Sequence, residues 1–502
     1  MRFSRPQLVM FDLNWVIEDS TGLRAHALDF AARTLLVSIS EQRALELTSS
    51  MYGCTPGSAP MSEHYFFWRR LLGNTRGVAA KDVPLDQVHD LFLQYLQRPM
   101  PASAIYPEVI GVLQSLREQG AKVAVVTNGN AHRVDAFLRH HGLYEMVDVV
   151  GASGELPHGK PHPTIFESVL AETGILPWRA VMVGDRTEMD IFGAANCGIW
   201  TCRVNRPGCE RFVNSDVSES ADFDCTDLTT VPEIRVPGDG ANPVETVVLL
   251  AGGKGTRMGC GMGGPPKVLL DFGNGMNALE WHLRMWESFR TRRIIIVMGS
   301  GVSEIEEYIA NRTSRGSEIV LIAANEEGTA RALSRAAHLL SERPVVAHAD
   351  ILYHPRLLSR VAKCALKFPD AAVLSVCDGR IAPTHASVLL GKNGEAARGF
   401  LFPQQKGDLA WSLPVSLGLS VLPRSVIPFL TAGEPDDMVE HGIARWKEGT
   451  GASVRTVSYT GEVCHIVYPA DILAAKRFSS SIVSQADRPV HGLGVSEQSQ
   501  GG

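Results

Sequence analysis

The stretch LVMFDLN, residues 8–14, places a carboxylate, Asp12, directly after a short apolar run. KVAVVTNGN (122–130) and AVMVGD (180–185) follow the same plan, with polar residues after an apolar run. Apolar runs of this length are typical of buried strands in a parallel sheet. Helix-like stretches such as HPTIFESVLAETG (162–174) lie between them. The alternation predicts a doubly wound α/β domain, with helices on both faces of a parallel sheet.

Polar side chains follow these predicted strands and their loops: Asp12, Thr127, Lys160, Asp185 and Asp190. The carboxyl ends of parallel strands lie at one edge of a sheet, where open α/β sheets bind ligands. We therefore expect the five side chains to converge. Such a set suits phosphoryl transfer, in which acids hold Mg²⁺, Lys and Thr hold phosphate oxygens, and a carboxylate attacks phosphorus.

Residues 7–235 resemble the haloacid dehalogenase-like hydrolase superfamily, whose four motifs occur here in the family's order. The matching segments are FDLNWVIEDS (11–20), VVTNGN (125–130), GKPHPTIF (159–166) and VGDRTEMDI (183–191). The resemblance implies Asp12 as the phosphorylated nucleophile and Thr127 and Lys160 as phosphate binders. It also implies Mg²⁺ held around Asp185 and Asp190, with Asp12 as a further ligand.

Asn14 departs from the pattern of this family. Its phosphatases and mutases usually carry an aspartate there, which acts as general acid and base, and a glycine where Trp15 stands. Asparagine cannot shuttle a proton, and general acid–base catalysis is typically worth about 10²–10⁴-fold. The metal contact at this position comes from the backbone in the family, so metal binding can persist. A phosphatase, a phosphomutase and an inactive binding module all stay open for this half.

The sequence also predicts the domain boundaries. Residues 20–104 carry apolar residues at helical spacing and interrupt the alternation, which predicts a helical cap inserted in a first domain over 1–235. VPGDGANPV (236–244) has the composition of a linker. A second α/β domain is expected over 245–478. The Gly/Ser/Gln-rich segment 479–502 is expected to be a disordered tail.

A glycine-rich loop opens the second domain, in LLAGGKGTRMG (249–259), and PPKVLL (265–270) follows it. Glycines let backbone N–H groups approach an anion without a clash from Cβ atoms. Arg257 and Lys267 add cationic donors beside them. The candidate nucleotide-binding residues of this loop are Gly252, Gly253, Gly255 and Thr256.

With its later elements, the segment 245–478 resembles the nucleotide-sugar pyrophosphorylase-like nucleotidyltransferases. EEGTARAL (326–333), with Gly328 and Thr329, is similar to the stretch that meets the nucleoside, and AHADIL (347–352) to the strand end whose aspartate binds Mg²⁺. The resemblance implies attack by a phosphate monoester on the α-phosphate of an NTP, with release of pyrophosphate. Arg257 and Lys267 would stabilise the triphosphate, and Asp350 would hold the metal.

Two segments of this domain depart from the family. CHIVYPADIL (464–473) places His465 and Val467 where a second acidic metal ligand is usual, and GFLFPQQ (399–405) is a degraded form of the sugar-phosphate segment. The expected activity is synthesis of an NDP-sugar-like product. The alternatives are a CTP-dependent cytidylyltransferase for a small phosphorylated alcohol, aminoalcohol or phosphonate, and a catalytically inactive binding module.

The composition of the chain limits the classes of binding partner that we expect. The 502 residues are 45% hydrophobic and 20% charged, with a net charge of −6, so no basic field invites nucleic acid or an anionic membrane. No apolar run approaches the ~20 residues of a membrane span. Nine cysteines without a C-x-x-C pair predict reduced thiols in a cytoplasmic protein. An NTP and a phosphorylated small molecule are the expected partners, and no oligomeric state follows.

Overall fold

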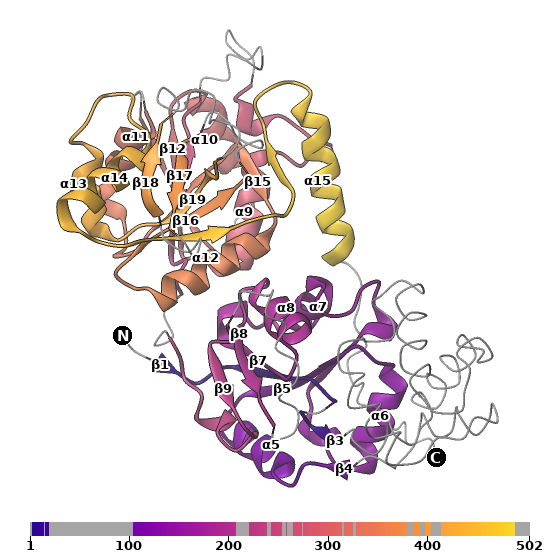
Figure 1. Ribbon diagram of the computed structural model, residues 1–502. Coiled ribbons are helices and arrows are strands. Elements are labelled where there is room, and N and C mark those ends of the chain that lie inside the picture. The colour runs from indigo at the N-terminus through magenta and orange to yellow at the C-terminus, as the bar shows by residue number, and fades with distance from the viewer. Residues whose placement is uncertain are drawn as a thin grey trace, which may run out of the picture. The chain divides into compact units, whose positions relative to one another are not determined.

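The structure is a computed structural model of the chain. It describes residues 3–14, 16–19, 104–206, 220–237, 242–253, 258, 265–273, 275–313, 316–324, 328–378, 385–391, 397–402 and 413–486. The chain divides into two compact units (Figure 1), the first built on Arg5–Val236 and the second on Pro237–Asp487. The division falls within the short strand β10 (Val236–Pro237), which pairs with β1 (Phe3–Ser4).

The first unit contains a six-stranded sheet in the order β6-β5-β2-β7-β8-β9, and every pairing is parallel. Its central strands are almost wholly buried because apolar helices cover both faces. The α/β prediction is confirmed for this unit. The strands are β2 (Leu8–Phe11), β5 (Lys122–Thr127), β6 (Val149–Ala152), β7 (Ala180–Gly184), β8 (Trp200–Val204) and β9 (Phe223–Cys225).

Helices α7 and α8 lie on one face of this sheet and α5 on the other (Figure 1). Helix α7 has Pro163 in its first turn and ends at Gly174, whose φ of 66° suits glycine. Asn130 caps α6 by accepting a hydrogen bond from the His132 backbone N–H at 2.8 Å. The helices are α5 (Val109–Glu118), α6 (Ala131–His140), α7 (Pro163–Thr173) and α8 (Phe192–Ala195).

A short antiparallel pair stands where the cap is predicted to leave the first unit. Strands β3 (Glu18–Asp19) and β4 (Ala104–Ile105) bracket that segment in the sequence. The predicted helices of the cap lie outside the described residues. The segments that enter and leave the predicted cap are thus paired with each other.

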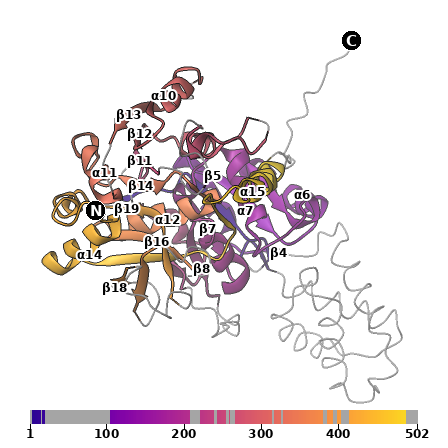
Figure 2. The same cartoon turned by 90° about the horizontal axis from the view of Figure 1, so that it is seen from above.

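The second unit is built on a nine-stranded sheet, and Figure 2 shows its strands following one another from β13 to β16. Strands β13, β12, β11 and β14 are parallel, but β19 runs antiparallel to both β14 and β16. The sheet is therefore mixed rather than purely parallel. Its strands are β11 (Thr246–Ala251), β12 (Arg293–Met298), β13 (Glu318–Ala323), β14 (Val345–His348), β16 (Ala372–Cys377), β17 (Ser387–Leu390), β18 (Ala397–Leu401), β19 (Val415–Val421) and β20 (Val454–Ser458).

Helices cover the second sheet, and a two-stranded ribbon of β15 (Ile351–Tyr353) and β21 (Val463–His465) adjoins the end of β14. Helix α15 continues past the predicted domain end at 478. Phe478, in the middle of this helix, packs edge-on against Trp281 with ring centroids 5.5 Å apart, and this contact holds the helix against the unit. The helices are α9 (Ala278–Ser288), α10 (Val302–Ala310), α11 (Thr329–Arg335), α12 (Pro355–Lys367), α13 (Ile427–Leu430), α14 (Val439–Thr450) and α15 (Asp471–Ala486).

Candidate functional sites

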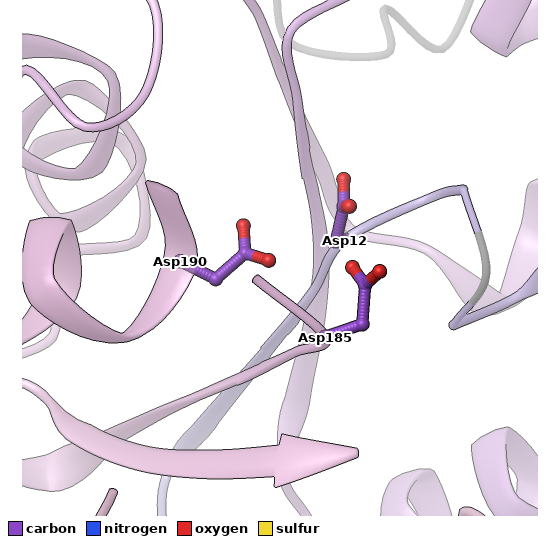
Figure 3. A group of neighbouring side chains, drawn as sticks. All are labelled: Asp12, Asp185 and Asp190. Carbon is purple, nitrogen blue, oxygen red and sulfur yellow. The ribbon is translucent and has the colours of Figure 1, made fainter. Parts of the chain in front are cut away.

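Three carboxylates meet at the carboxyl edge of the first sheet. Asp12 follows β2, Asp185 follows β7, and Asp190 lies in the π-helical turn Thr187–Ile191. One oxygen from each lies within 4.8 Å of the other two. Figure 3 shows the three side chains converging from these separate elements. The topology thus brings together the acids that the sequence placed at separate strand ends.

Lys160 joins this cluster from the segment before α7. Its Nζ donates to Asp12 Oδ1 and to Asp190 Oδ1, each at 2.7 Å. The lysine side chain is 3% exposed, so both ion pairs are shielded from water. Thr127, the last residue of β5, is buried at the same sheet edge.

The cluster combines three carboxyl groups with one ammonium group, and it is shielded from water. Burial raises the pKa of Asp12 to about 6, although the ammonium of Lys160 lowers it. Burial also raises the pKa of Asp185 well above its ordinary value, and the charges of Asp190 and Asp12 add to this rise. The buried Asp185 Oδ1 has no hydrogen-bond partner among the described residues. An orphaned carboxylate oxygen beside two other acids fits a hard divalent cation.

Two residues that the sequence reasoning missed shape this site. The Asn128 side chain accepts from the Lys160 backbone N–H at 2.6 Å and donates to its carbonyl at 2.8 Å, so it fixes the lysine's backbone. A Cβ on Gly184 would lie 2.3 Å from the Cβ of Asp190, so only glycine lets that carboxylate approach. Asn128 directly follows the predicted site residue Thr127 at the end of β5, and this place in the sequence could have identified it.

Asn14 is half-buried and forms an isolated bridge with Glu18. It therefore stands at the entry to the short β3–β4 pair. Trp15 lies outside the described residues. Position 14, where the family usually carries an aspartate, thus lies beside the segment that leads to the predicted cap.

The second unit has a pocket of about 270 Å³ at the end of β11. Six of the predicted residues line it together: Gly252, Gly253, Lys267, Gly328, Thr329 and Asp350. Three others, Gly255, Thr256 and Arg257, lie outside the described residues. The glycine loop, the start of α11 and the segment after β14 therefore face one space.

Asp350 is the charged centre of this pocket. Its Oδ2 accepts from Lys267 Nζ at 2.5 Å and lies 3.6 Å from His465 Nε2. Burial alone would raise the pKa of Asp350, but the adjacent His465 imidazole and the charge of Lys267 hold it well below its ordinary value. The carboxylate is therefore ionised throughout the neutral range.

Gly328 sets the shape of the pocket wall. Its φ is 82°, and a Cβ there would lie 2.6–2.7 Å from the backbone of residues 435–437. Next to it, the Thr329 hydroxyl accepts a hydrogen bond from the Val439 backbone N–H at 3.0 Å. The start of α11 is thus packed directly on the segment before α14. A side chain at 328 would separate the two.

Comparisons with known proteins agree with the two units. Residues 25–198 match the family of haloacid dehalogenase-like hydrolases, and residues 247–404 match the MobA-like NTP transferase domain. A glyceraldehyde 3-phosphate phosphatase of Methanopyrus kandleri is 30% identical over 206 residues, 39% of this chain and 83% of that protein. A ribulose-1,5-bisphosphate 5-phosphatase of Halopiger xanaduensis is 32% identical over 185 residues, 37% of this chain and 74% of that protein.

Among solved structures, a UDP-glucose pyrophosphorylase complexed with UDP-glucose is similar at 13% identity and a TM-score of 0.42, covering 47% of this chain and 99% of its own. An inositol-1-phosphate CTP transferase from T. maritima has 19% identity and a TM-score of 0.40, and the match covers 51% of this chain and 99% of that protein's chain. In the described part of the chain, no helix has the length and apolar character to cross a membrane.

Proposed function

We propose that this chain, which belongs to the haloacid dehalogenase-like hydrolase family and carries a MobA-like NTP transferase domain, is an enzyme with two active sites. The first would hydrolyse or rearrange a phosphate monoester. The second would transfer a nucleotidyl group from an NTP to a phosphorylated small molecule. The convergence of the predicted residues at both sites carries this proposal.

In the first unit, an Asp12 oxygen would attack phosphorus, and the substrate oxygen would leave as the aspartyl phosphate forms. Water would then release phosphate and restore the carboxylate. Lys160 stands against Asp12 Oδ1 and would balance the charge of a phosphoryl oxygen. The residues that would hold Mg²⁺ are Asp12, Asp185 and Asp190, and the ion would neutralise phosphate oxygens.

Asn14 limits the first reaction, because it offers no proton to the leaving oxygen and no base for water. We therefore expect weak hydrolysis of an aryl phosphate, whose leaving group needs little protonation. Asp12→Asn should abolish this activity, and Asn14→Asp should increase it. If both the wild-type protein and Asn14→Asp bind phosphorylated ligands without turnover, the first unit is a binding module.

In the second unit, an oxygen of the acceptor's phosphate would attack the α-phosphorus of the NTP, and pyrophosphate would leave. Lys267 and the backbone of Gly252 and Gly253 face the pocket and would bind the triphosphate. Catalysis of this kind rests on positioning and charge, so no protein base is required. We infer that a sugar phosphate is the acceptor and an NDP-sugar-like compound the product.

Pyrophosphate release tests this proposal. The full chain is assayed with ATP, CTP, GTP and UTP, each against sugar 1-phosphates and small phosphorylated alcohols, aminoalcohols and phosphonates. Release that needs one NTP, one acceptor and Asp350 supports transfer, and a small acceptor with CTP would favour the cytidylyltransferase alternative. Binding of an NTP without release under any pairing would contradict an active transferase. The cytoplasmic location expected from the cysteine pattern stays a prediction.

A further inference from the structure

We propose that Asp350 and His465 together form a mixed carboxylate–imidazole metal site, which prefers Mn²⁺ or another first-row transition dication to Mg²⁺. This inference deepens the proposed nucleotidyltransferase and rests on that site. Mg²⁺ is the ion that the family resemblance implies here. An imidazole in place of a second carboxylate fits that ion poorly, because Mg²⁺ prefers oxygen ligands, whereas imidazole suits transition metals.

The backbone holds the two side chains side by side. Strand β21 pairs antiparallel with β15, and His465 lies directly opposite Ile351, the residue after Asp350. The Ile466 N–H donates to the Asp350 carbonyl at 2.9 Å. His282, a buried side chain, contacts the Ile351 carbonyl through Nε2 at 3.1 Å. The register of the two strands therefore holds the backbones of Asp350 and His465 side by side.

The separation of the two ligand atoms fits one shared ion. His465 Nε2 lies 3.6 Å from Asp350 Oδ2. Two ligands about 2.0–2.2 Å from one metal, at an angle between perpendicular and tetrahedral, lie about 3–3.5 Å apart. The site therefore needs only a slight contraction to bind the ion. Lys267 Nζ balances Asp350 Oδ2 in the structure and would turn to the triphosphate once a metal is bound.

Further imidazoles surround this pair. The His385 ring meets the His465 ring edge-on with centroids 5.0 Å apart, and its Nδ1 lies 2.7 Å from the Ser416 carbonyl. His348 lines the nucleotide pocket with Asp350 and lies 6.1 Å from His385, ring to ring. Among the described residues, no set of three ligand atoms closes around Asp350. Phosphate oxygens of the nucleotide and water would complete the coordination, as is usual for metal–nucleotide sites.

Metal binding to the full chain tests the inference without turnover. The background carries Asp12→Asn and Asp185→Asn, which remove the acidic cluster of the first unit. Electron paramagnetic resonance measures free Mn²⁺ during titration, with tripolyphosphate present to supply phosphate ligands, and Mg²⁺ is then added as competitor. We expect one Mn²⁺ per chain that Mg²⁺ displaces only in large excess. His465→Ala should weaken Mn²⁺ binding by about tenfold or more.

His465→Asp and His338→Ala complete the design. The aspartate restores two carboxylates, so it should retain metal while lowering the preference for Mn²⁺ over Mg²⁺ by about tenfold. His338 is an exposed histidine of the same unit, and its replacement should change nothing. Equal affinities for the two ions in the parent protein, or an unchanged Mn²⁺ affinity in His465→Ala, would overturn the site. Absence of pyrophosphate release with intact His465-dependent binding would refute only the proposed transfer.

Discussion

Replacing Lys160 by methionine removes the ammonium that bonds both Asp12 and Asp190. Both nitrogen–oxygen distances are 2.7 Å, and the three side chains are at most 8% exposed. Removing one partner of a buried ion pair costs about 3–5 kcal/mol, because the remaining charges stay uncompensated. We therefore expect the free energy of unfolding of the first unit to fall by about 3–5 kcal/mol at pH 8.

This loss should depend on pH. The pKa of Asp12 is raised by burial to about 6 with Lys160 present, and removal of the ammonium raises it further. A carboxyl whose pKa is higher in the folded than in the unfolded state reduces stability as the pH rises between the two values. The loss in Lys160→Met should accordingly be smaller near pH 5, where Asp12 keeps its proton and only the bond to Asp190 is lost, than at pH 8.

Hydrogen exchange in increasing urea, read by mass spectrometry on peptides from β2, β5 and β7, reports on the first unit separately. Lys122→Met is the matched control, because this exposed lysine begins β5 and its side chain donates to the Thr173 carbonyl at 3.2 Å. Its effect should stay within about 0.5 kcal/mol. The reasoning is refuted if Lys160→Met destabilises equally at both pH values, or no more than the control.

Three substitutions test other features. Gly184→Ala should displace Asp190 and reduce Mg²⁺ affinity in calorimetric titration, whereas Gly111→Ala in α5, where a Cβ meets nothing within 4 Å, should not. Gly328→Ala should abolish NTP binding in the same assay, while Gly275→Ala, also at positive φ but in open space, should preserve it. Lys267→Ala should weaken NTP binding by about 1.5–3 kcal/mol, the usual worth of a charged hydrogen bond, and an unchanged affinity would contradict its assignment.

The sequence by itself determined the α/β class of both units and the grouping of the first site. Asp12, Asp185 and Lys160 belong to the ends of strands or to the loops beside them, and parallel topology puts those ends at one edge. Local hydrophobic pattern and motif order are sufficient for that conclusion. The glycine loop and Asp350 share a pocket for the same reason, since β11 and β14 are parallel neighbours.

Only the tertiary structure decided the remaining contacts. The antiparallel course of β19, the clamp of Asn128 on Lys160 and the packing of Gly328 on the segment before α14 join residues distant in sequence. The backbone of His465 likewise lies beside that of Asp350 only because of the register of β15 and β21. Strand partners and side-chain packing depend on how the whole chain closes around its core, and a local residue pattern carries no record of them.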